Sequence, residues 1–224
     1  MLENIEVIVF DWDGTLVDSV GPKIEQNRQL AEFFGNPLTN EEVRQYWAQA
    51  RDYQELMQML CPGVDMSEIQ AEVDNQYNNP EFRKKRMGFN ANYLIHTLSS
   101  HDDIKTAIAT SIPRELFVRD ANSLGIRIEL SESESGLSFT QTSDETDFKK
   151  PDGNFFKPTL KFFREVGITA EKIMYIGDEK KDIYAARDAG MIAVGVTSGL
   201  ATATEFKNLG AIHIPNAYEI LSYT

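Results

Sequence analysis

Short apolar runs recur along the chain, and most are separated by stretches with helical periodicity. Residues 5–10 are apolar and rich in β-branched side chains, and the run stops at Asp11. This pattern is typical of a strand that is covered on both faces. Similar runs predict five further strands, at residues 104–110, 126–130, 173–177, 192–196 and 211–214.

Helical patterns lie between most of these strands. Residues 114–124, 155–166 and 181–189 are each followed by a glycine, which is the residue that favours a left-handed C-terminal cap. Strands and helices that alternate, with right-handed crossovers, form a parallel sheet covered by helices on both faces. The sequence therefore predicts an α/β fold built on a three-layered, Rossmann-like parallel sheet.

Residues 19–87 differ, because they carry helical signals without a strand-like run. Thr39 and Glu42 have the form of a capping box at the start of a helix. Further helices are predicted at residues 52–60 and around Ile69. The segment is therefore interpreted as an all-helical module inserted after the first strand.

The predicted domain boundaries follow from this insertion. Residues 1–15 and 90–224 form the α/β core, and residues 16–89 form the helical domain. Within the core, residues 131–147 are polar, acidic and rich in Ser and Thr. This composition predicts a long surface loop.

The formal net charge is −13, which excludes the basic surface that nucleic-acid-binding proteins use to displace counterions. The same charge would repel an anionic substrate, so a phosphate site must supply its own positive charge. One cysteine, Cys61, excludes an intrachain disulfide, and no segment resembles a signal peptide or a membrane span. We expect a soluble, cytoplasmic protein that binds neither nucleic acid nor membrane, of undetermined oligomeric state.

Residues with candidate chemistry stand at the ends of the predicted strands. The carboxyl ends of parallel strands share one edge of a sheet, where ligands bind, so residues far apart in the sequence can meet there. The first strand ends in Asp11, Trp12, Asp13 and Gly14. The side chain of Asp11 and the backbone carbonyl of Asp13 can face one hard cation, and Mg²⁺ prefers such oxygen ligands.

The string DWDGTLVDS, which begins at Asp11, resembles the first motif of the haloacid dehalogenase (HAD) phosphotransferases. The resemblance implies a HAD-like fold and a Mg²⁺-dependent phosphatase, of the phosphoglycolate phosphatase-like subgroup with a helical cap inserted after this motif. It also implies that Asp11 attacks phosphorus and forms an aspartyl-phosphate, while Asp13 is the general acid and base. Dehalogenation is disfavoured because that branch of the family lacks the second aspartate.

The resemblance also implies two residues that bind phosphate. Thr110 ends the second core strand, where the family holds a phosphate oxygen with a hydroxyl group, although a helix cap alone would also explain a threonine here. In the family, a lysine that is followed by proline offsets the negative charge on the nucleophile. Lys150 is preferred over Lys157 for this role, because Pro158 would fall within the first turn of a helix.

The fourth strand end resembles the GDxxxDIxAAxxAG motif of the same family. The resemblance implies that Asp178 coordinates Mg²⁺, and that Asp182 is either a direct ligand or bonded to a coordinated water. Glu179 is an additional acidic candidate. The implied metal ligands are Asp11, Asp13 and Asp178, and the implied catalytic residues are Asp11, Asp13, Thr110 and Lys150.

The implied substrate is a small phosphorylated metabolite, such as a sugar phosphate, a phosphoglycolate-like acid or a nucleotide. A phosphomutase of the same superfamily and a non-catalytic protein on the same fold stay open as alternatives. Histidine chemistry is not indicated, since a zinc site needs clustered ligands and the three histidines are scattered, at His96, His101 and His213.

Overall fold

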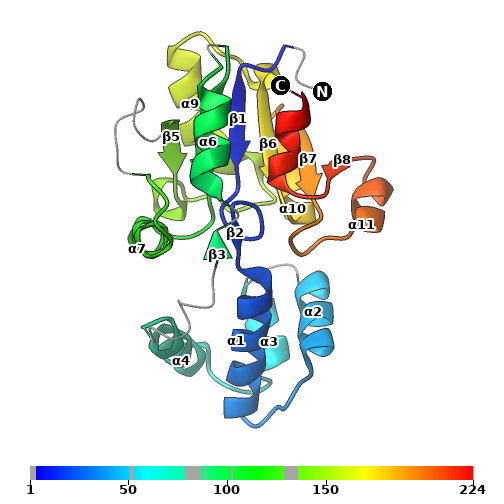
Figure 1. Cartoon of the computed structure of the whole chain (residues 1–224). Helices are drawn as coiled ribbons and strands as arrows, with labels where there is room; N and C mark the ends of the chain where they lie inside the picture. Colours follow the sequence, from blue (N-terminus) through cyan, green and yellow to red (C-terminus); the bar gives the residue numbers. More distant parts are fainter. Residues whose placement is uncertain are drawn as a thin grey trace. The chain divides into compact units, whose positions relative to one another are not determined.

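The computed structural model describes residues 4–50, 53–78, 87–88, 90–101, 103–128 and 136–223. Its main sheet has six parallel strands, as predicted, in the order β5-β4-β1-β6-β7-β8 (Figure 1). In chain order these strands are β1 (Val7–Phe10), β4 (Lys105–Ala109), β5 (Leu137–Gln141), β6 (Ile173–Gly177), β7 (Ile192–Val196) and β8 (Ile212–Ile214).

Side chains that alternate along β1 point into two separate apolar clusters, one on each face of the sheet. Ile8 and Phe10 pack with residues of α6 (Ala91–Ser99), α7 (Arg114–Leu124) and η4 (Ala217–Tyr223). Val7 and Val9 belong to the opposite cluster. That cluster also takes residues from η2 (Gly153–Phe156), α9 (Lys157–Glu165), α10 (Lys180–Asp188) and α11 (Ala203–Asn208), while η1 (Ser143–Glu145) and η3 (Ala170–Lys172) are short connections.

The strand at the edge of the sheet corrects two predictions. Residues 126–128 form no strand, and residues 129–130 lie outside the described part of the chain. Instead, β5 pairs with β4, inside the segment that was predicted to be a surface loop. Its sequence LSFTQ is polar, but Leu137 and Gln141 are buried and the ring of Phe139 stacks on Phe162 at 4.6 Å. An edge strand needs fewer apolar residues than a central one, which is why the surrounding polar sequence concealed it.

Residues 19–87 form a second compact unit, whose described part contains four helices, while residues 1–18 and 88–224 form the first. The helices are α1 (Val20–Phe33), α2 (Asn40–Gln49), α3 (Tyr53–Leu60) and α4 (Met66–Asn78). Thr39 and Glu42 form the capping box of α2 that their spacing predicts.

The observed division differs by two or three residues from the boundaries at 16 and 89. Leu16 and Val17 are buried in the apolar cluster of the α/β unit, which extends that unit past the first motif. The strands β2 (Val17–Asp18) and β3 (Met87–Gly88) pair in a separate two-stranded sheet where the chain passes between the units.

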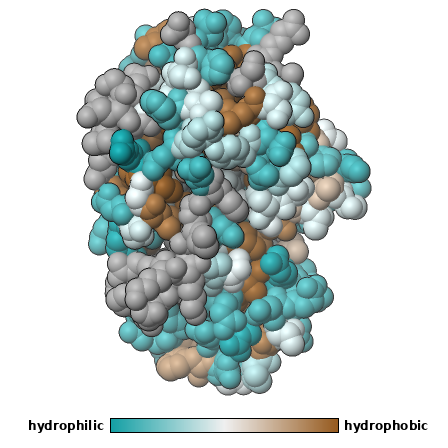
Figure 2. Space-filling model, viewed as in Figure 1, coloured by the Kyte–Doolittle hydropathy of each residue, from teal (hydrophilic) through white to brown (hydrophobic). Residues whose placement is uncertain are grey.

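Hydrophilic residues cover most of the described surface that faces the viewer in Figure 2. Among the residues that the structure describes, no helix is both long enough and apolar enough to span a bilayer.

Candidate active site

Two neighbouring strands deliver acidic residues to one edge of the sheet. Asp11 follows β1 and Asp178 follows β6, and the two strands pair with Phe10 opposite Ile176. The backbone N–H of Asp11 donates to the carbonyl of Ile176, with an N···O distance of 2.8 Å. The order of strands in the sheet therefore brings together carboxylates that are far apart in the sequence.

A third carboxylate joins them from the first turn of α10. Oxygen atoms of Asp11, Asp178 and Asp182 lie within 4.8 Å of one another, and all three side chains are buried. Asp182 is fixed locally, because its Oδ2 accepts the backbone N–H of Glu179 at 2.9 Å. Three acidic groups that are buried together need positive charge or protons nearby.

Lys150 supplies part of that charge. Its side chain is 1% exposed, and its Nζ lies 2.8 Å from Oδ1 of Asp182 and 3.2 Å from Oδ1 of Asp11. The alternative lysine lies elsewhere, with the Nζ of Lys157 placed 4.5 Å from the centre of the Phe148 ring. Of the two lysines considered from the sequence, the structure therefore brings Lys150 to the carboxylate of Asp11.

The burial of these groups alters their protonation. Burial raises the pKa of Asp11 to about 7, the positive charge of Lys150 opposes this rise, and the charge of Asp182 adds to it. The pKa of Asp178 lies well above its ordinary value, first because of burial and then because of nearby acidic groups. Burial would lower the pKa of Lys150, but the charges of Asp11 and Asp182 outweigh it, so its pKa is raised. The lysine is thus charged, while burial makes Asp11 and Asp178 harder to ionise than exposed aspartates.

Glycines let the backbone approach Asp178 closely. A Cβ atom added at Gly14 would lie 2.2 Å from the Oδ2 of Asp178, and one added at Gly199 would lie 2.1 Å from the same atom. The loop after β7 also holds this carboxylate, because the backbone N–H of Leu200 donates to its Oδ2 at 2.9 Å. Any larger residue at either glycine would displace Asp178.

Thr110 lies at the same edge of the sheet. It follows β4, which pairs with β1 with Phe10 opposite Ile108, so Thr110 and Asp11 leave adjacent strands in the same direction. The side chain of Thr110 is buried, and its backbone N–H donates to the carbonyl of Gln141 at 3.0 Å.

Asp13 lies two residues further along the loop that leaves β1. It is partly exposed, and its carboxylate is not part of the buried cluster. The loop is tight, since the N–H groups of Leu16 and Val17 both donate to the carbonyl of Trp12, at 2.9 and 3.0 Å. The loop therefore holds Asp13 in a defined position beside the buried carboxylates.

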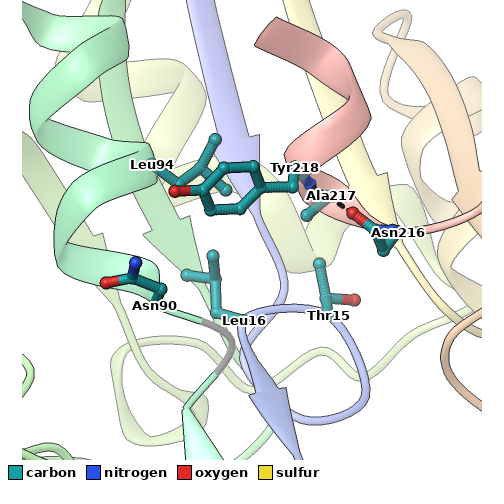
Figure 3. Close-up of a pocket in the computed structure, with 7 residues that line it drawn as sticks. All are labelled: Thr15, Leu16, Asn90, Leu94, Asn216, Ala217 and Tyr218. Carbon is teal, nitrogen blue, oxygen red and sulfur yellow. Dashed lines mark hydrogen bonds between the residues drawn. The ribbon is translucent and has the colours of Figure 1, made fainter.

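A hollow of about 410 Å³ lies beside Thr15 and Leu16, which belong to the same loop (Figure 3). The side chains of Leu16, Leu94 and Tyr218 gather around it in the close-up. None of the three clustered carboxylates lines it, so the hollow is separate from the acidic site.

The amino-acid sequence matches that of a known family. The sequence profile of haloacid dehalogenase-like hydrolases matches residues 8–196. The chain belongs to the haloacid dehalogenase-like hydrolase family. The predicted family, fold and enzyme class of HAD phosphatase are thereby confirmed.

Relatives and solved structures agree with this membership. A phosphoglycolate phosphatase of Vibrio cholerae is 28% identical over 207 residues, which cover 88% of this chain and 87% of that protein. A phosphorylated carbohydrates phosphatase of Thermotoga maritima is 25% identical and covers 97% of both chains. A candidate HAD-like hydrolase of Bacteroides fragilis superposes with a TM-score of 0.75 at 19% identity, covering 96% of this chain and 99% of that one. The chain is thus a HAD phosphatase of the phosphoglycolate phosphatase type.

Three features of this HAD site were not predicted from the sequence. The hydroxyl group of Tyr175, in the middle of β6, contacts the Nζ of Lys150, and the backbone of Leu200 holds Asp178. Tyr175 lies within an apolar run, a pattern that predicts a core residue. The N–H of Leu200 is a backbone group, so the type of side chain at that position does not indicate its role. The close approach of Gly14 and Gly199 was likewise missed.

Glu179, the additional acidic candidate, is paired with a neighbouring cation. Its Oε1 lies 2.6 Å from the Nζ of Lys181, and both side chains are partly exposed. The charge of Glu179 nevertheless contributes to the raised pKa of Asp178.

Proposed function

We propose that this HAD phosphatase hydrolyses a small phosphorylated metabolite in a Mg²⁺-dependent reaction, through an aspartyl-phosphate on Asp11. One observation carries the proposal: the Asp11 carboxylate lies at the edge of the sheet with two acidic groups within 4.8 Å and the Lys150 ammonium at 3.2 Å. This set combines a nucleophile, ligands for a hard cation and a fixed positive charge.

The residues present suit Mg²⁺. The donors are carboxylate oxygens, which hard cations prefer, and three of these acidic side chains are buried together. Asp11, Asp178 and the backbone carbonyl of Asp13 would hold the ion. Both oxygens of Asp182 already accept hydrogen bonds from protein groups, so we assign it the role of fixing Lys150. When bound, Mg²⁺ supplies charge neutralisation between the nucleophile and the phosphoryl oxygens.

The side chains then divide the reaction between them. A carboxylate oxygen of Asp11 attacks phosphorus, and the bond from phosphorus to the leaving oxygen breaks. Asp13 donates a proton to that oxygen, so the first product leaves as an alcohol. The ammonium group of Lys150 and the hydroxyl group of Thr110 hold the charge on the equatorial oxygens.

The second half of the reaction releases phosphate. Asp13, now a carboxylate, takes a proton from a water molecule, which attacks the phosphorus of the aspartyl-phosphate. The bond between phosphorus and the Asp11 oxygen breaks, and both aspartates return to their initial state. A partly exposed Asp13 suits this role, because it must exchange protons with the leaving group and with water.

The substrate class is proposed from chemistry and from the relatives' names. Those relatives are phosphatases of phosphoglycolate and of phosphorylated carbohydrates, so we propose a small phosphorylated acid or sugar here. The net charge of −13 disfavours a polyanion such as nucleic acid. The helical unit, residues 19–87, stays a predicted cap.

Hydrolysis of p-nitrophenyl phosphate tests the proposal. Asp11→Asn should lower kcat by at least about a thousandfold, because an amide cannot replace the nucleophile. Removal of divalent ions with EDTA should abolish turnover in the native protein, and added Mg²⁺ should restore it. The matched control is Asp103→Asn, since Asp103 is an exposed aspartate of the same unit. Its activity should stay within about twofold of the native value.

Two results would overturn the proposal. Undiminished hydrolysis by Asp11→Asn would remove Asp11 as the nucleophile, and unchanged hydrolysis in EDTA would remove the metal. No hydrolysis of any phosphorylated metabolite by the native protein would favour the non-catalytic alternative, whereas transfer of phosphate between two positions of a sugar would favour the phosphomutase.

A further inference from the structure

We propose that Tyr175 is a positioning residue: its hydroxyl group orients the Lys150 ammonium toward Asp11 and links it to the strand end that carries Thr110. The proposal rests on the proposed function, in which Lys150 holds charge on the phosphoryl group. Tyr175 lies inside the sheet, and its hydroxyl group would then assist catalysis through Lys150 while its ring packs in the core.

The ammonium group of Lys150 has an oxygen neighbour for each of its N–H donors. An ammonium group has three N–H donors, and the Nζ of Lys150 has three oxygen neighbours. These are Oδ1 of Asp182 at 2.8 Å, the hydroxyl oxygen of Tyr175 at 2.5 Å and Oδ1 of Asp11 at 3.2 Å. Two contacts are short and come from residues that stay in place during the reaction. The third, the longest, points to the nucleophile.

The direction of the hydrogen bonds follows from the charge on lysine. A charged ammonium can only donate, so the oxygen of Tyr175 accepts from Lys150. The tyrosine proton is then donated to the carbonyl of Ala109, whose oxygen lies 3.1 Å from the hydroxyl oxygen. Ala109 is the last residue of β4 and directly precedes Thr110. One hydroxyl group thus connects the lysine with the peptide that leads into the phosphate-binding threonine.

The surroundings of the lysine explain why this contact matters. The Nζ lies 5.2 Å from the centre of the Phe155 ring and 5.0 Å from the centre of the Tyr175 ring, and the side chain is almost fully buried. A lysine has a flexible stem, and aromatic faces attract its charge without fixing its direction. Without the hydroxyl group, one N–H would lack a strong acceptor and the ammonium would lose a fixed direction.

Tyr175→Phe removes only the hydroxyl group and isolates this effect. The ring is kept, so its contact with Phe156, at 4.6 Å between ring centres, is retained. We expect kcat with p-nitrophenyl phosphate to fall about tenfold with KM changed less than about threefold, because a charged hydrogen bond that acts mainly in the transition state is lost. The inhibition constant for orthovanadate, which adopts the geometry of the transferring phosphoryl group, should rise by a similar factor.

The inhibition constant separates positioning from packing. A variant that merely folds less well contains fewer active molecules, which lowers the apparent kcat but leaves the inhibition constant of each active molecule unchanged. Thr159→Val is the matched control, because it also removes a buried hydroxyl group, which donates to Oε1 of Gln141 at 2.5 Å. It should lose stability but keep the native inhibition constant.

A double-mutant cycle completes the test. In Lys150→Met, and in Lys150→Arg if Lys150→Met does not fold, Tyr175→Phe should lower kcat by less than about twofold, because neither side chain has the compact ammonium group that Tyr175 orients. The proposal would be overturned if Tyr175→Phe lowered kcat by the same factor with native Lys150 and with the Lys150 variant. An unchanged inhibition constant for orthovanadate in Tyr175→Phe would also overturn it. Failure of the proposed function is distinct, since it would appear as unchanged hydrolysis in Asp11→Asn.

Discussion

At the scale of single residues, the site is defined by an excess of buried negative charge. Asp11, Asp178 and Asp182 lie close together, and the ammonium group of Lys150 contacts two of them, Asp11 and Asp182. Burial raises the pKa of Asp11 to about 7 and raises that of Asp178 as well. Protons and the proposed Mg²⁺ would therefore compete for the same oxygens.

This competition predicts how stability changes with pH. An acid whose pKa is raised on folding binds a proton in the folded state that the unfolded chain has released. Its stabilising effect is complete below the unfolded pKa, near 4, and is lost as the pH rises through the folded value, about 7 for Asp11. We expect the metal-free protein to have a lower Tm at about pH 8 than at about pH 5, and Mg²⁺ to raise Tm more at the higher pH.

Thermal unfolding with EDTA or with Mg²⁺ measures both effects. Asp178→Asn should flatten the dependence of Tm on pH and remove most of the gain from Mg²⁺, while Asp103→Asn should behave as the native protein does. A Mg²⁺ effect of equal size at both pH values would contradict the assignment of these carboxylates as the metal site.

At the scale of elements, the edge of the sheet is tied to the helix behind it by one buried amide. The Nε2 of Gln141, at the end of β5, donates to the carbonyl of Phe155 at 2.6 Å. Its Oε1 accepts from the backbone N–H and the hydroxyl group of Thr159, at the start of α9. The backbone of Gln141 also accepts the N–H of Thr110, so the same residue supports the strand end beside the site.

Gln141→Leu should therefore be strongly destabilising. It keeps the side-chain volume but leaves three buried polar groups without their partner, which predicts a loss of about 2–4 kcal/mol in the free energy of unfolding. Urea unfolding followed by fluorescence of Trp12, in a Trp47→Phe background, would report on the α/β unit alone. Asn122→Leu, at an exposed amide of the same α/β unit, should cost less than about 0.5 kcal/mol. A loss of similar size in both variants would contradict this role of the amide.

The same strand marks the limit of prediction from sequence. The central strands β1, β4, β6 and β7 carry mainly apolar runs, and the edge strand β8 keeps an isoleucine at both ends, so these five strands could be predicted to within two residues. Edge strand β5 could not, because only alternate side chains reach the core and its flanks are polar. The preference for Lys150 over Lys157 rests on the position of the prolines, since Lys150 stands about one helical turn further from the fourth motif than the family pattern leads one to expect. The contacts of Lys150 with Asp11 and Asp182 agree with this preference, whereas the role of Tyr175 depends on a distance that only the folded chain reveals.

At the scale of the whole molecule, a net charge of −13 contrasts with a substrate that is itself an anion. The surface cannot attract such a substrate, so binding depends on local positive charge at the edge of the sheet. Lys150 supplies one fixed charge there, and the proposed Mg²⁺ supplies more. Both apolar clusters of the α/β unit are built from its own residues, so the acidic site and the framework that holds it belong to one unit.

The central claim is that Asp11 becomes phosphorylated, and chemical trapping tests it most directly. Asp13→Asn should slow the attack of water. With p-nitrophenyl phosphate, whose leaving group departs without a proton, the intermediate should therefore accumulate during turnover with Mg²⁺. After rapid quenching, borohydride reduces an aspartyl-phosphate to homoserine, which mass spectrometry of the peptide can locate. The account predicts homoserine at position 11 and none in the absence of substrate. Homoserine at another aspartate, or none during active turnover, would contradict it.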